Sequence, residues 1–371
     1  MELFIRDCCP HGLAKRTVVT SEHKNVGRTR AAIAVAAVLV VPALLNTLTN
    51  EVLRARHPVP GAFYRINGRP MHLYCSGHGA PTVVLDAGGG NDWLIWQKVQ
   101  PELAKTQRVC SYDRAGVGWS ELQPGVRDAR NISMELHQLL TQAGESKPFV
   151  LVGASVAGFY ARQYVDRYPS EIAGLVLVDS STPEQIQAIP GSVYSAELIK
   201  RKHREVMLEW WKEASGWALL MGDCKADVEP GLEAYSDLAR AETCRPSYAT
   251  SWRGEADQFW NSAEEAARAL CCKDLPLLII SQDPDNPRST QPTSIRSIWN
   301  SMQEGLKALS PRARRVIARG SGHGVMIDRP DVVIRGIREI SAAAATHEGV
   351  QRLFAPTAGD VTWLVKLVIF G

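Results

Sequence analysis

Short apolar runs alternate with helical patterns along most of the chain, and this alternation predicts an α/β architecture. The runs that predict strands are 62–66, 71–75, 82–85, 108–112, 149–152, 172–178, 275–281 and 314–318. Apolar positions at helical spacing predict helices over 94–103, 132–143, 294–309 and 332–345. Because a strand–helix–strand order needs a crossover connection, we expect a mostly parallel central sheet flanked by helices.

The stretch 149–160 is the centre of this pattern, because it places a serine between a strand and a helix. Ser155 lies in a turn whose neighbours are small, as a sharply bent backbone requires, although Ala157 replaces the second glycine of the Gly-x-Ser-x-Gly pattern. The next predicted strand, 172–178, follows directly after the helix. Ser155 is therefore expected at the carboxyl edge of the parallel strands, where open α/β sheets bind ligands.

Three further stretches carry recognisable patterns. Residues 83–90 read Val-Val-Leu-Asp-Ala-Gly-Gly-Gly, residues 112–120 read Tyr-Asp-Arg-Ala-Gly-Val-Gly-Trp-Ser, and residues 321–323 read Ser-Gly-His. Together with the Ser155 turn, they resemble the oxyanion loop, the Asp-x-x-Gly-x-Gly-x-Ser turn and the histidine loop of the α/β-hydrolase superfamily. The resemblance covers about residues 58 to 345 and implies the α/β-hydrolase fold with an inserted helical cap.

The resemblance also implies a mechanism. Ser155 would attack a carbonyl, His323 would take and return the proton, and the backbone N–H groups of Gly89 and Val156 would hold the oxyanion. The expected protein is a serine hydrolase that cleaves a carboxylic ester of a small acyl substrate. Hydrolysis of amides, thioesters or carbon–carbon bonds and acyl transfer stay open.

Two alternatives are weighed against the esterase. Dehalogenases and epoxide hydrolases of the family are disfavoured, because they use an Asp nucleophile where this chain has Ser155. The rival class is a membrane-tethered binding protein on a hydrolase scaffold that has lost turnover. Ala157 and the absence of a histidine before Gly88 favour that rival, whereas the presence of all three triad residue types in their expected order favours the enzyme.

Three carboxylates are candidates for the acid that orients His323. The family pattern, counted from the proline that leads the strand, places the acid nine positions later, at Asp285. Asp283 lies two positions earlier, and the proline between the two makes the turn stiff, so their side chains should point in different directions. Asp179 is the third candidate, because the end of the neighbouring strand also reaches the histidine in some family members. We expect Asp285 to be the acid.

The segment 181–273 interrupts the alternation of strands and helices and is too long for a loop. In the resembled family a helical cap stands here, and Trp210 and Trp211 are candidates for the wall of an apolar substrate pocket, with ordinary packing as the alternative. The expected organisation is a leader and apolar segment (1–56), a hydrolase core (57–180 and 274–346), a cap (181–273) and a tail without a counterpart in the family (347–371).

Residues 31–48 are almost wholly apolar, and as a helix they would extend about 27 Å, close to the ~30 Å hydrocarbon core of a bilayer. Basic residues precede this run, so we expect a membrane anchor with the catalytic domain outside the cytoplasm. Arg54 and Arg56, which follow the run, weaken this prediction. A cleaved signal peptide, which would make the protein secreted, and a buried or mis-started N-terminus are the alternatives.

Composition limits the partners. The chain has 371 residues and a formal net charge of only +3, and it lacks basic stretches interleaved with aromatic residues, so we expect no nucleic-acid partner. The cysteine spacing suggests no metal site, and no cofactor is predicted. Cys75 and Cys110 lie on strands that are neighbours in the resembled fold, where we expect free thiols. Cys224 and Cys244 could form a bridge if the body lies outside the cytoplasm.

Overall fold

The computed structural model describes residues 21–189, 196–224, 228–242, 245–269, 272, 274–287, 289 and 291–354. Its centre is an eight-stranded sheet in the order β1-β2-β4-β3-β5-β6-β7-β8. The strands are β1 (Ala62–Ile66), β2 (Arg69–Ser76), β3 (Thr82–Asp86), β4 (Val109–Tyr112), β5 (Phe149–Ala154), β6 (Ile172–Val178), β7 (Leu277–Gln282) and β8 (Ala313–Ala318). β2 is antiparallel to both β1 and β4, and all other pairs are parallel. The predicted fold class is confirmed.

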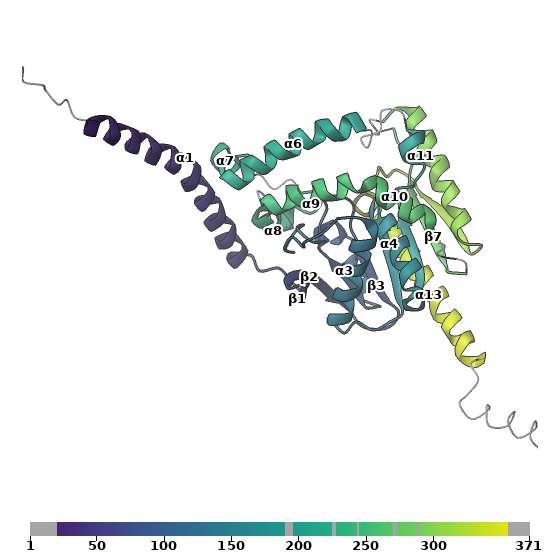
Figure 1. Ribbon diagram of the computed structural model, residues 1–371. Helices are drawn as coiled ribbons and strands as arrows, with labels where there is room; N and C mark the ends of the chain where they lie inside the picture. The colour runs from purple at the N-terminus through teal and green to yellow at the C-terminus, as the bar shows by residue number, and fades with distance from the viewer. Residues whose placement is uncertain are drawn as a thin grey trace, which may run out of the picture.

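Helices cover both faces of the sheet, and a group of them forms a separate layer at one side (Figure 1). The helices are α1 (Ser21–Arg56), α2 (Gln100–Ala104), α3 (Ala129–Gln142), α4 (Ala157–Arg167), α5 (Gln185–Ala188), α6 (Ala196–Ser215), α7 (Trp217–Met221), α8 (Ser236–Glu242), α9 (Pro246–Asp257), α10 (Phe259–Arg268), α11 (Thr293–Gly305), α12 (Val325–Asp328) and α13 (Pro330–Phe354). Short 3-10 helices are η1 (Trp93–Trp96), η2 (Pro169–Glu171), η3 (Glu233–Tyr235) and η4 (Leu306–Leu309).

Two apolar layers hold the sheet between its helices. On one face, Leu136 and Leu139 of α3 and Tyr164 of α4 pack on strand residues such as Leu151. On the other face, α12 and α13 contribute a matching cluster that includes Val333. The five central strands are buried along almost their whole length, as expected for parallel strands covered on both sides. This rigid core fixes where the strand ends lie.

The helix predicted over 94–103 is wrong as a single element. The chain forms η1 and then the short α2 instead, with Pro101 near the start of α2. Proline has no N–H to donate to the preceding turn, so a continuous helix would lose a hydrogen bond there. Asp92 caps η1 by accepting the N–H of Leu94 at 2.8 Å. The break brings Trp93 and Trp96, both almost fully buried, against the sheet.

The segment between β6 and β7 forms the helices α5 to α10. α6 lies along α9, and both stand above the core in Figure 1. The α9 helix contacts the core directly, since Ser251 donates to the carbonyl of Ala115 at 2.6 Å. Gly116 lies under the same helix, where an added Cβ would meet Ser251 Cβ at 2.8 Å.

The N-terminal helix α1 is long and contains Pro42. Its second half contacts the rest of the protein: Asn46 donates to the carbonyl of Glu213 at 2.8 Å, and Arg54 lies 4.6 Å from the ring centre of Trp119. Among the residues that the structure describes, no helix is both long enough and apolar enough to cross a membrane. The prediction of a membrane-spanning helix over 31–48 is therefore not supported.

Cys75 of β2 and Cys110 of β4 form a disulfide, so the expectation of free thiols there is wrong. The two residues are direct partners in the antiparallel register, which brings their side chains together. Together with Glu145 they are the only described group with the composition of a metal site, but thiols joined in a disulfide offer no thiolate ligand. Cys224 is disulfide-bonded, and Cys244 lies outside the described residues.

Candidate active site

Ser155 lies between β5 and α4 with a left-handed backbone, φ +52°. Its N–H donates to the carbonyl of Val178 at 3.0 Å, which ties the turn to the neighbouring strand. The turn needs glycine at two positions: a Cβ on Gly153 would lie 2.7 Å from the carbonyl oxygen of Ala157, and one on Gly158 would lie 1.6 Å from Ser180 Oγ. In the Gly-x-Ser-x-Gly pattern the second glycine would stand at position 157. Here the second position without room for a Cβ is 158, which explains why alanine is accepted at position 157.

His323 stands on the loop between β8 and α12 and faces Ser155. Its Nε2 lies 3.0 Å from Ser155 Oγ, and its Nδ1 lies 2.6 Å from Oδ2 of Asp179. About half of the imidazole surface is exposed, whereas the Asp179 side chain is fully buried. This is the geometry of a nucleophile, a base and an acid that orients the base. The neutral imidazole with Nδ1–H donating to the carboxylate leaves Nε2 free to accept the serine proton.

The predicted acid, Asp285, does not reach the histidine, and this prediction is wrong. Its side chain is 80% exposed and pairs with Arg319 at 3.0 Å. Asp283 is also engaged elsewhere: it accepts the N–H of Gly320 at 2.9 Å and holds the start of the histidine loop. Burial opposes ionisation of Asp283, but the N–H groups of Gly320 and Asp285 and the Arg319 charge together lower its pKa.

Asp179 is held in place from three directions. One oxygen accepts the N–H of Gln282 at 3.0 Å and the indole N–H of Trp299 at 2.9 Å, while the other faces His323. The backbone of Asp179 is left-handed, φ +42°, which is uncommon outside glycine and turns the side chain toward the histidine. Trp299 also meets the His323 ring edge-on, with ring centres 6.0 Å apart. Sequence reasoning missed Trp299, because nothing in its local pattern distinguishes it from another helix residue.

The pKa of His323 is raised above the usual imidazole value. The protein atoms packed around the ring displace part of its water and disfavour the charged form, but the hydrogen bond and the negative charge of Asp179 outweigh this effect. The same interaction stabilises the imidazolium that forms when the base takes a proton. His72, by contrast, is fully buried between Asp113 and the carbonyl of Pro60, at 2.8 and 2.7 Å, and lies away from Ser155 in a structural position.

The two predicted oxyanion donors lie beside the serine. Val156 is the N-cap of α4, and the first N–H groups of a helix have no acceptor within the helix. The loop after β3 passes close by: a Cβ on Gly88 would lie 3.3 Å from Ser155 Cβ, and one on Gly89 would lie 3.5 Å from a methyl group of Val156. The N–H groups of Gly89 and Val156 therefore belong to backbone segments that adjoin the nucleophile.

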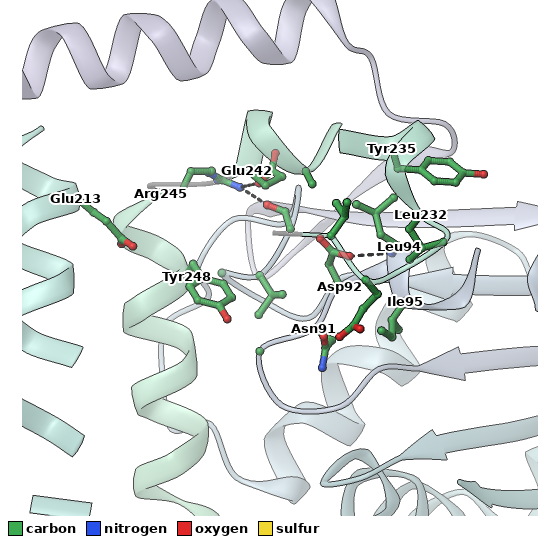
Figure 2. A pocket seen from close by; sticks show the side chains of 17 residues that line it. Asn91, Asp92, Leu94, Ile95, Glu213, Leu232, Tyr235, Glu242, Arg245 and Tyr248 are labelled. Carbon is green, nitrogen blue, oxygen red and sulfur yellow. Dashed lines mark hydrogen bonds and ion pairs between the residues drawn. The ribbon is translucent and has the colours of Figure 1, made fainter. Parts of the chain in front are cut away.

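A cavity of about 300 Å³ lies beside this loop, between the core and helices α6, α8 and α9 (Figure 2). Gly90 lines the cavity and Gly88 adjoins Ser155, so the same loop borders both the cavity and the nucleophile. Aliphatic residues and several carboxyl groups form its walls. Burial, with the nearby Asp113 charge, raises the pKa of Asp92 to about 7, and burial raises that of Glu213 to about 7 and that of Glu242 to about 8.

The two predicted pocket tryptophans have different surroundings. Trp210 lines a second cavity of about 250 Å³ between α6 and α9, together with Val206, Met207 and residues of α9. Trp211, the next residue, is 47% exposed. Trp210 thus lines a cavity, but that cavity is not the one beside the Gly88–Gly90 loop, and the role of the two tryptophans in substrate binding stays a prediction.

Residues 81–330 match the model of the α/β hydrolase fold family. The chain belongs to this family. An AB hydrolase superfamily protein of Gibberella zeae is 25% identical to this chain over 311 residues, covering 73% of this chain and 92% of that one. For the first three curated relatives the match covers 17%, 39% and 56% of the relative's own length, so the chain spans little more than half of these proteins at most.

Solved structures of hydrolases share the fold. A putative lipase from Acinetobacter baumannii aligns with a TM-score of 0.56 and 19% identity, covering 81% of this chain and 97% of that one. An esterase from Exiguobacterium antarcticum aligns with a TM-score of 0.57 and 16% identity, covering 76% of this chain and 99% of that one. At such identities the likeness shows the α/β-hydrolase fold and not the substrate.

Proposed function

We propose that this hydrolase cleaves carboxylic esters through an acyl-enzyme intermediate formed on Ser155. One observation carries the proposal: Ser155 Oγ, His323 and Asp179 lie in a continuous hydrogen-bonded relay of 3.0 and 2.6 Å. A serine hydroxyl is a weak nucleophile at its ordinary pKa and becomes reactive when an adjacent base accepts its proton. A binding protein without turnover has no need of this relay.

The steps follow from the positions of these groups. His323 Nε2 removes the proton of Ser155 as Oγ attacks the ester carbonyl, and Asp179 stabilises the imidazolium that results. The N–H groups of Gly89 and Val156 stabilise the negative oxygen, each contributing on the order of 10² to 10³ in rate. The imidazolium then protonates the leaving alcohol, and a water activated by the same base releases the acid.

Structural neighbours include epoxide hydrolases, which differ in substrate class from esterases. Epoxide hydrolases of the resembled family use an Asp nucleophile, whereas this chain has Ser155 at that position. A serine relay favours acyl transfer over epoxide opening. Attack of a serine on an ester gives an acyl-enzyme that water hydrolyses, whereas its attack on an epoxide would give an ether, which water does not cleave.

A panel of p-nitrophenyl esters of increasing acyl length tests the proposal. The unmodified chain should release p-nitrophenol with saturation kinetics, and Ser155→Ala should lower turnover by orders of magnitude, to the residual level that binding and the oxyanion donors supply. Turnover that is equal in Ser155→Ala and the unmodified chain would refute the proposal.

We also propose that the folded body lies outside the cytoplasm. The disulfide between Cys75 and Cys110 supports this, because such bonds persist in oxidising compartments and are rare in the cytoplasm. Reporter fusions placed after Ala345 should then be active only outside the cytoplasm. A reporter that is active in the cytoplasm would contradict the proposal.

A further inference from the structure

The guanidinium of Arg114 lies directly beneath the loop that adjoins the nucleophile. Only 2% of the side chain is exposed, and it donates to two successive carbonyl groups of that loop, those of Ala87 at 2.5 Å and Gly88 at 2.8 Å. One rigid side chain therefore fixes the orientation of two consecutive peptide groups. Gly88 adjoins the nucleophile, since a Cβ there would lie 3.3 Å from Ser155 Cβ.

The direction of an oxyanion donor follows from these contacts. In a trans peptide, the C=O of one residue and the N–H of the next point in opposite directions. The peptide between Gly88 and Gly89 is not among the cis bonds of the described chain. Because Arg114 binds the Gly88 carbonyl from below, the N–H of Gly89 points away from the guanidinium.

Arg114 is itself oriented by two carboxylates from different parts of the chain. Asp86, at the end of β3, accepts from Nη1 at 2.7 Å. Glu255, on helix α9, accepts from Nε at 2.8 Å and from Nη2 at 3.1 Å, which is the planar two-bond geometry that guanidinium and carboxylate favour. The Tyr160 ring packs on the guanidinium, 5.4 Å from its central carbon. Glu255 is 5% exposed, so water does not replace this contact.

The same helix touches the loop on its cavity side. Gly90 has φ +73°, and a Cβ there would lie 2.8 Å from Tyr248 Oη and 3.1 Å from Trp252, both on α9. Two other residues of α9 contact the turn 113–116: Ser251 donates to the carbonyl of Ala115, and Glu255 accepts from Arg114. The loop is thus enclosed between Arg114 below and α9 beside it.

We infer that Glu255, a residue of the inserted helical segment, is a positioning residue that aims the Gly89 N–H at the oxyanion by locking Arg114 onto the Ala87 and Gly88 carbonyls. The inference rests on the proposed ester hydrolysis for its catalytic consequence. Docking of α9 on the core then completes the oxyanion site. The inserted segment contributes to the reaction itself, and not only to enclosing the substrate.

Glu255→Gln tests the inference, because it keeps the shape of the side chain and removes the charge that holds Arg114. The matched control is Glu171→Gln, another largely buried carboxylate, whose partners Lys147, His137 and Tyr164 lie at the opposite end of the sheet. Glu255→Asp is the second variant if the glutamine variant does not fold: it keeps the charge but cannot span the same distance.

Two readouts are taken on the full chain. Hydrogen–deuterium exchange of a peptide covering 86–92 should be faster in Glu255→Gln than in the unmodified chain and unchanged in Glu171→Gln. With a p-nitrophenyl ester, kcat of Glu255→Gln should fall by about tenfold or more, up to the 10² to 10³ of a lost oxyanion donor, while KM stays within about twofold. Glu255→Asp should give a smaller change in the same direction.

The inference would be overturned if hydrogen–deuterium exchange of the 86–92 peptide in both Glu255 variants equalled that of the unmodified chain. It would also be overturned if kcat of Glu255→Gln equalled kcat of Glu171→Gln. A fall in kcat with a matching rise in KM would indicate a role in substrate binding and would also overturn it. If the unmodified chain hydrolyses no ester, the proposed function fails separately, and the exchange data still decide whether Glu255 holds the loop.

Discussion

The carboxylate of Asp179 lies 2.6 Å from Nδ1 of His323, although the two residues are 144 positions apart in the sequence. Asp179 directly follows β6 and His323 follows β8, so the side chain reaches across the end of the intervening strand β7. The turn directly after β7 instead holds the histidine loop, because Asp283 in this turn accepts the N–H of Gly320 in the loop. The carboxylate that contacts His323 therefore comes from the end of the strand that follows α4.

Replacing the acid should remove turnover without unfolding the protein. Asp179→Asn should lower kcat by up to about 10⁴, because the amide favours the wrong imidazole tautomer and cannot stabilise the imidazolium. The matched control is Asp285→Asn, which should keep near-normal turnover because its carboxylate faces Arg319 and solvent. Steady-state kinetics with one ester compares the two. Loss of turnover in Asp285→Asn with retention in Asp179→Asn would reverse the assignment.

The pH dependence of kcat/KM should report the Asp179–His323 interaction. His323 must be neutral to accept the serine proton, and its raised pKa means that activity is lost as pH falls through a midpoint above the usual ~6.5. In Asp179→Asn the two causes that raise the pKa are absent, so the remaining activity should show a midpoint at lower pH. An unchanged midpoint in that variant would show that another group controls the acid limb.

Trp299→Phe should weaken catalysis by loosening Asp179. Phenylalanine keeps the aromatic ring but lacks the N–H that donates to the carboxylate at 2.9 Å. Hydrogen bonds to charged groups contribute about 1.5–3 kcal/mol, so kcat should fall by about tenfold or more. Trp260→Phe, at an exposed position on α10, is the control and should keep normal kcat. Equal kcat in both variants would mean that Asp179 is held without Trp299.

The serine turn should tolerate no side chain at Gly158. An added methyl group would lie 1.6 Å from Ser180 Oγ, so Gly158→Ala should lower the free energy of unfolding by roughly 1–3 kcal/mol or more. Gly305→Ala is the control, because no heavy atom lies within 4 Å of its added Cβ. Urea denaturation measures both. If the two variants were equally stable, the close packing of the turn would be refuted.

The sequence predicted the positions of Ser155 and His323 correctly because each depends on local structure. Ser155 and His323 both stand in glycine-containing turns at strand ends, and short-range spacing is enough to find such turns. The strands themselves were predicted from continuous apolar runs, since strands buried on both faces leave that signature. The eight observed strands overlap the eight predicted runs.

The acid could not be chosen in this way. Asp179 and Asp285 both follow apolar strands, and β6 and β7 are parallel neighbours whose ends meet at one edge. Which end faces the histidine depends on the left-handed backbone at Asp179 and on the contact with Trp299, neither of which is visible as a pattern. The pairing of Cys75 with Cys110 shows the same limit, since sequence indicates adjacent strands but not whether two thiols are oxidised.

Covalent labelling tests the central claim most directly. The full chain is treated with a fluorophosphonate, and the modified residue is located by mass spectrometry of its peptides. We predict one adduct on Ser155, formed rapidly in the unmodified chain, slowly in His323→Ala and not at all at position 155 in Ser155→Ala. An adduct on a different residue, or labelling that persists unchanged in Ser155→Ala, would contradict the assignment of Ser155 as the nucleophile.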